Sequence, residues 1–100
     1  MKSIFVVTTL EYKRGLSYHS DSRTVGWFDN EIDARNEVEG NSLDIHEGNF
    51  NYCVIEKTET GIYPVPPLKE IWYYWNKEKE RYVRIRKPKK LKSIVNFGIG

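Results

Sequence analysis

The sequence predicts an α+β fold, in which an antiparallel sheet of about five strands carries one main helix packed on one face. Several short runs rich in β-branched and aromatic residues predict the strands, and one segment near the middle of the chain carries both helix-start and helix-stop signals. A chain of 100 residues has the size of one domain, so we expect residues 1–100 to form a single domain.

Three strands are predicted before the last third of the chain. The β-branched run from Ile4 to Thr9 predicts a central strand, and "TVGWFD" (24–29) predicts a second. Residues 13–23 are rich in Gly, Ser and Asp, which predicts an exposed loop. "FNYCVIEKTE" (50–59) alternates as a third strand, whereas the glycine and three prolines of "TGIYPVPP" (60–67) predict a stiff extended connection.

The predicted helix lies between the second and third strands. Asp29 or Asn30 is a suitable N-cap, and Gly40 and Asn41 are typical of a helix end, so we expect a helix that ends near Glu39.

Three apolar residues of this helix, Ile32, Ala34 and Val38, are expected to face the sheet. They form a weak apolar stripe, so packing on the sheet must supply most of the helix stability. The segment 41–49 that follows is expected to be irregular, with room for one short turn.

A hairpin is predicted in "EIWYYWNKEKERYVRIRKP" (70–88). We expect residues 71–75 to pair with 81–85 so that Tyr73 faces Val83 and Trp72 faces Arg84, because this register makes one face largely apolar. The residues expected on the core face are Ile71, Tyr73, Val83 and Ile85. The residues expected on the outward face are Trp72, Tyr74, Tyr82, Arg84 and Arg86.

Charge is unevenly distributed. Residues 1–60 carry 6 Lys/Arg against 11 Asp/Glu, whereas residues 61–100 carry 10 against 3. The stretch from Arg81 to Lys92 holds seven cations and no acid. Such a block is either an anion-binding surface or one side of an internal pairing with the acidic segment 29–39, and the sequence leaves both open.

The outward aromatic residues and the cations after them form the candidate binding site. Its predicted members are Trp72, Tyr74, Tyr82, Arg84, Arg86, Lys87, Lys89 and Lys90. Aromatic residues and arginine are enriched at protein interfaces, so the first expectation is a non-enzymatic binding module that engages a host partner protein. The alternative is single-stranded nucleic acid or a nucleotide, because rings stack on bases and guanidinium groups bind phosphate. A third interpretation is that the proline-rich connection or the C-terminal residues cover Trp72 and Tyr74.

No motif predicts an enzyme, a metal site or a cofactor. His46 lies near Asp44 and Glu47, but the chain has no metal-ligand spacing, and it has no nucleophile elbow or phosphate-binding glycine loop. The single cysteine, Cys53, lies within a predicted strand and is expected to be a small buried hydrophobe.

The expected location is the cytoplasm, without membrane insertion. The apolar runs "IFVV" and "IWYYW" are far shorter than the roughly 20 residues that span a bilayer. A lone thiol fits a reducing compartment.

The pattern "RTVGWFDNEIDARNEVEGN", "NYCVIE", "GIYP" and the C-terminal "NFGIG" resembles a set of small, uncharacterised proteins of bacteria and their phages and prophages. The resemblance covers residues 23–100 and depends chiefly on the strand-to-helix entry "GWFDNEIDA" and on "NFGIG". It implies a stand-alone accessory protein that acts by binding a host factor, and it supplies no catalytic residues.

Overall fold

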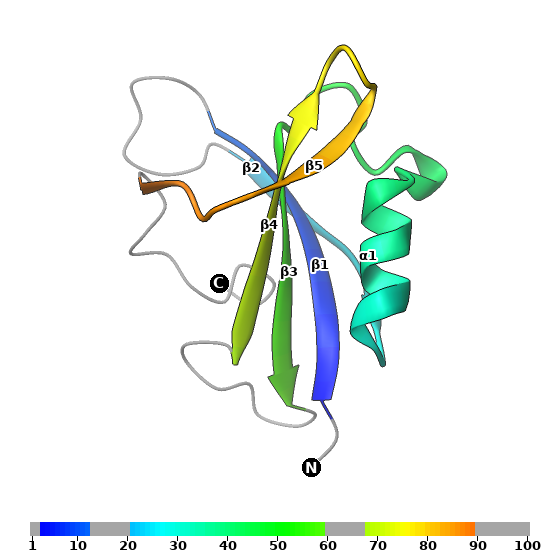
Figure 1. The fold of residues 1–100 in the computed structure, drawn as a ribbon, viewed down its shortest axis with the longest axis vertical. Coiled ribbons are helices and arrows are strands. Elements are labelled where there is room, and N and C mark those ends of the chain that lie inside the picture. Colours follow the sequence, from blue (N-terminus) through cyan, green and yellow to red (C-terminus); the bar gives the residue numbers. More distant parts are fainter. Residues whose placement is uncertain (1–2, 13–20, 60–67, 90–100) are drawn as a thin grey trace.

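The structure is a computed structural model and describes residues 3–12, 21–59 and 68–89. Five strands form one antiparallel sheet in the order β2-β1-β3-β4-β5. One α-helix lies against a face of this sheet and contacts β1, β2, β3 and β5 (Figure 1). The predicted α+β class is therefore confirmed.

The strands are β1 (Ser3–Glu11), β2 (Asp21–Phe28), β3 (Tyr52–Glu59), β4 (Lys69–Asn76) and β5 (Arg81–Ile85). β2 begins earlier than predicted, because residues 21–23 pair with β1 instead of belonging to the preceding loop. The rest of that predicted loop (13–20), the proline-rich connection (60–67) and the chain from residue 90 onward lie outside the described residues.

Helix α1 (Glu31–Glu39) begins where the sequence predicts. The Asn30 side chain accepts a 2.8 Å hydrogen bond from the backbone N–H of Asp33, which satisfies one of the unpaired amides of the first turn. At the other end the backbone N–H of Gly40 donates to the Asn36 carbonyl at 3.0 Å, and Asn41 takes the left-handed conformation, with a φ of 48°. The helix thus ends through Gly40 and Asn41, and a short 3₁₀ helix (Ser42–Asp44) follows.

The predicted sheet-facing side of α1 is partly wrong. Ala34 and Val38 are fully buried against the sheet, but Ile32 is 70% exposed. Residues four apart share a helix face, whereas residues two apart point in nearly opposite directions. Ile32 therefore cannot share a face with Ala34, and the helix is anchored by two small side chains.

Both faces of the sheet carry apolar clusters. The cluster beneath α1 contains Phe5, Val7, Ala34, Val38, Cys53, Ile55, Ile71, Tyr73 and Tyr82. The cluster on the opposite face contains Leu10, Tyr52, Val54 and Trp72, with Tyr12 and Ile85 packed against it. Large aromatic side chains of the hairpin therefore enter both clusters.

The predicted register of the β4–β5 hairpin is wrong by one residue. Trp72 faces Ile85, Tyr73 faces Arg84, and Trp75 faces Tyr82. Because side chains alternate between faces, this shift moves every β5 side chain to the opposite side of the sheet from the one predicted. Tyr82 now lies beneath α1, while Val83 and Ile85 are half-buried on the other face.

The turn explains the observed register. Asn76 pairs with Arg81 as the last residues of the two strands, so that the connection has four residues instead of the five expected. The Asn76 side chain accepts a 2.9 Å hydrogen bond from the Lys79 N–H, and Glu80 takes a left-handed conformation, with a φ of 53°. Turn geometry sets register in a hairpin, and it outweighs the face pattern here.

The Trp72→Ala substitution is expected to lower the free energy of unfolding by about 3–5 kcal/mol, since it removes a large buried ring from the core. Trp72 is 2% exposed, whereas Trp27 of the edge strand β2 is 65% exposed, so Trp27→Ala is the matched control and should cost about 1 kcal/mol or less. Chemical denaturation of the two variants measures both values. Equal losses would show that Trp72 is not part of the core.

Candidate functional site

Three of the predicted binding residues are held inside the structure. Trp72 and Tyr82 are buried, and Lys87 is half-buried, so the expectation of a continuous outward aromatic strip is wrong. Tyr74 is 42% exposed, and Arg84, Arg86 and Lys89 are exposed, although Arg84 lies on the α1 side of the sheet and not on the predicted face. Lys90 lies outside the described residues.

Trp72 and Lys87 belong to one packed group on the sheet face opposite α1. The Trp72 indole N–H donates to the Glu70 carboxylate at 2.9 Å, and the Lys87 ammonium forms an ion pair with the same carboxylate at 3.1 Å. The Lys87 ammonium also lies 5.9 Å from the centre of the Trp72 ring. Lys87 is therefore engaged within the fold, and Trp72 offers no free ring face for a base.

Tyr82 connects β5 to the loop that precedes β3. Its hydroxyl donates a 2.7 Å hydrogen bond to the Phe50 carbonyl in a buried setting, and burial raises the pKa of Tyr82. Its ring packs edge-on against Trp75, with the ring centres 5.2 Å apart. Tyr82 thus has a structural role that the hairpin pattern alone did not reveal.

The cations that are exposed on β5 and just after it form one surface of the molecule. We call this surface the basic edge, and its described members are Arg81, Arg84, Arg86 and Lys89. β5 is an edge strand of the sheet, paired only with β4 in the described part of the chain. No ion pair links a member of the basic edge to another described residue.

The acidic residues of α1 find other partners. Glu31 forms an ion pair with Lys69 at 2.8 Å, and Arg35 lies 3.7 Å from Glu31 and 3.5 Å from Glu39. The hydrogen bond from Lys69 lowers the pKa of Glu31, and the charges of Lys69, Arg35 and Arg84 act in the same direction. Over the described residues, the predicted internal pairing of the acidic segment 29–39 with the basic block therefore contains no direct contact.

A shallow hollow lies between α1 and the basic edge. It has a volume of about 300 Å³ and is lined by Arg35 and Glu39 of the helix and by residues 81–84 of β5. Tyr73 donates a 2.8 Å hydrogen bond to the Glu39 carboxylate, and this bond fixes one wall of the hollow. Arg81 and Arg84 thus border a recess that can receive an acidic side chain of a partner.

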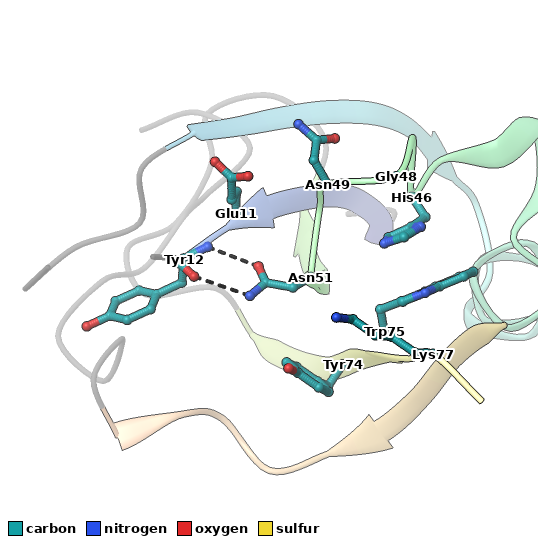
Figure 2. Close-up of a pocket in the computed structure, with 9 residues that line it drawn as sticks. All are labelled: Glu11, Tyr12, His46, Gly48, Asn49, Asn51, Tyr74, Trp75 and Lys77. Carbon is teal, nitrogen blue, oxygen red and sulfur yellow. Dashed lines mark hydrogen bonds between the residues drawn. The ribbon is translucent and has the colours of Figure 1, made fainter. Parts of the chain in front are cut away.

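A second hollow, which we call the end pocket, opens where β1 and β4 end and β3 begins (Figure 2). Its volume is about 420 Å³. Its lining residues come from the end of β1, the loop before β3, and the end of β4 with its turn: Glu11, Tyr12, His46, Gly48, Asn49, Asn51, Tyr74, Trp75 and Lys77. Sequence reasoning placed only Tyr74 in a site, because these three segments are far apart in the chain.

His46 forms part of the wall of the end pocket. Its ring stacks on Trp75 with the ring centres 3.7 Å apart and the planes 8° from parallel. Burial lowers the pKa of His46, while the nearby Asp44 opposes that shift. Within the described ranges no group of three or more His, Cys, Asp or Glu side chains is arranged to hold a metal ion.

Cys53 is fully buried beneath α1, as the strand pattern predicts. Burial strongly raises the pKa of its thiol, because the low-dielectric interior disfavours the thiolate. A thiol in this state lacks the properties of a nucleophile.

Comparisons with known proteins returned no family model, no curated protein and no solved structure that matches this chain. In the described part of the chain no helix has the length and apolar character needed to cross a membrane.

Cys53 is expected to resist a thiol reagent in the native protein and to react fully in denaturant, since it is buried and held as the neutral thiol. The chain has one cysteine, so the amount of label measured by mass spectrometry reports on this site alone. Rapid labelling of the native protein would contradict the buried position.

His46 is expected to make the protein less stable as the pH falls below about 6.5, the ordinary pKa of histidine in an unfolded chain. Because the folded pKa lies lower, the unfolded chain binds more protons in this window, and its population rises. Denaturation between pH 7.5 and roughly 5.5 should show a steeper loss in the wild type than in His46→Gln. Equal slopes would contradict this account.

Proposed function

We propose that the protein is a non-enzymatic binding module that engages an acidic surface of a partner protein through the basic edge. The observation that carries this proposal is the set of exposed guanidinium groups of Arg81, Arg84 and Arg86, which make no ion pair with another described residue. Exposed charges of one sign attract a partner of opposite charge and speed its association.

The shape of the surface also favours a protein partner. Arg81 and Arg84 border the hollow beside α1, and the Glu39 carboxylate on its other wall is held by Tyr73 and Arg35, so a carboxylate entering there meets two exposed guanidinium groups. Arginine binds carboxylates in a bidentate manner and is enriched at protein interfaces. The sequence-based expectation gave three aromatic residues a part in binding. The present proposal depends on the arginines, because among Trp72, Tyr74 and Tyr82 the exposed side chain is that of Tyr74.

Nucleic-acid binding has weaker support. Sequence-tolerant binding of single strands uses several exposed rings on which successive bases stack. With Trp72 and Tyr82 buried, two of the three aromatic residues of the predicted strip are lost for stacking. A host factor of protein nature is therefore the partner we propose, consistent with an accessory protein of bacterial or phage origin.

Arg84→Glu is expected to weaken partner binding at least tenfold, because it replaces an attractive charge at the centre of the basic edge by a repulsive one. Arg23→Glu is the matched control: Arg23 is also an exposed arginine, it lies in the other edge strand β2, and the substitution changes the net charge equally. Arg23 pairs with Glu47 at the surface, so its replacement should cost little stability.

The measurement is affinity capture from an extract of the source organism, treated with nuclease, with wild type and both variants at equal concentration. Proteins retained by wild type and Arg23→Glu but lost from Arg84→Glu would support the proposal. Loss of all captured material on nuclease treatment would instead favour nucleic acid, and equal capture by all three proteins would contradict a role for the basic edge.

A further inference from the structure

One wall of the end pocket is a pair of aromatic rings that are already fixed in place. Trp75 and His46 form the close stack described above on the α1 side of the sheet, and Tyr82 packs edge-on against both rings. Tyr74 also lines the pocket, but its ring lies on the other side of β4 and packs edge-on against Tyr52, with the ring centres 5.1 Å apart. A planar ligand entering the pocket would meet rings that lose little freedom on binding, which favours affinity.

The floor of the end pocket is equally fixed. The Asn51 side chain accepts a 3.0 Å hydrogen bond from the Tyr12 N–H and donates a 3.2 Å bond to the Tyr12 carbonyl (Figure 2). The Asn51 carbonyl accepts a 2.9 Å bond from the Trp75 N–H. One residue thus ties the ends of β1 and β4 together, and the pocket keeps its shape without a ligand.

Lys77 supplies a positive charge to the end pocket. It lines the pocket, and Figure 2 shows its side chain directed toward the space between Asn51 and Tyr74. Lys77 forms no ion pair with another described residue. Glu11, at the opposite rim, already takes part in another interaction. The pocket therefore presents an available cation beside an aromatic wall.

We propose that the end pocket binds a small ligand that combines a planar aromatic ring with an anionic group. The ring would lie against the Trp75–His46 stack, and the anionic group would pair with the Lys77 ammonium. The volume of about 420 Å³ lies within the roughly 300–1,000 Å³ that is usual for small-molecule sites. A nucleoside monophosphate and an aromatic carboxylate share this chemistry.

This site is separate from the basic edge. None of the residues that line the end pocket belongs to the basic edge. The Arg84→Glu variant should therefore still bind the ligand. If the end pocket binds no ligand, the proposed binding of a partner protein by the basic edge is unaffected, because the capture experiment tests it separately.

The test is a titration of the isotope-labelled protein, followed by nuclear magnetic resonance, with two anions and their uncharged counterparts. The probes are adenosine monophosphate against adenosine, and N-acetyltryptophan against N-acetyltryptophanamide. The chain has three tryptophans, so three indole N–H signals serve as reporters. We expect at least one anion to shift the Trp75 signal, to leave the Trp27 and Trp72 signals in place, and to bind about tenfold more tightly than its uncharged counterpart.

Two substitutions test the two parts of the proposal. Lys77→Gln should reduce the affinity of the anion to that of the uncharged probe, and His46→Leu should weaken both probes about tenfold by removing one ring of the stack. Lys79→Gln is the matched control, because Lys79 lies in the same turn, is exposed and does not line the end pocket. An unchanged Trp72 indole signal verifies that each variant is folded.

Each result decides the proposal. Binding of adenosine monophosphate alone identifies a nucleotide ligand, and binding of N-acetyltryptophan alone identifies an aromatic carboxylate. The proposal is overturned if neither anion shifts the Trp75 signal, if Lys77→Gln and Lys79→Gln bind the anion equally, or if the shifts centre on Arg84 and Arg86.

Discussion

The pairing register of β4 and β5 determines which hairpin side chains enter the interior and which reach solvent. It places Tyr82 beneath α1, where its hydroxyl donates to the Phe50 carbonyl and its ring supports Trp75. It also places Ile85 beside Trp72 on the other face of the sheet. A shift by one residue would move Tyr82 to the other face of the sheet and remove its buried hydrogen bond to the loop before β3.

Both proposed binding surfaces depend on this arrangement. The register leaves Arg81, Arg84 and Arg86 exposed at the edge of the sheet, while Lys87 turns back to pair with Glu70. The same register places Tyr82 edge-on against both Trp75 and His46, which stack on each other and line the end pocket. The hairpin therefore separates its side chains into structural aromatic residues, an exposed basic edge and a ring-lined pocket.

Local signals in the sequence predicted the local structure well. The Asn30 cap, the β-branched run of β1 and the buried Cys53 each depend on neighbouring residues in the chain, and all three were found as expected. The hairpin register was missed because the hydrogen bond of Asn76 to its own turn outweighed the face pattern. The end pocket could not be predicted, since Asn51 joins segments far apart in the sequence.

The most direct test of the account is the set of cross-strand proton contacts between β4 and β5, measured by nuclear Overhauser effects in the native protein. The account predicts backbone contacts between Tyr74 and Val83 and between Trp72 and Ile85, since these residues face each other. Contacts between Tyr73 and Val83 and between Ile71 and Ile85 would contradict it. Tyr82 would then lie on the outer face, away from Trp75 and His46, and the basic edge would have other members on the α1 side.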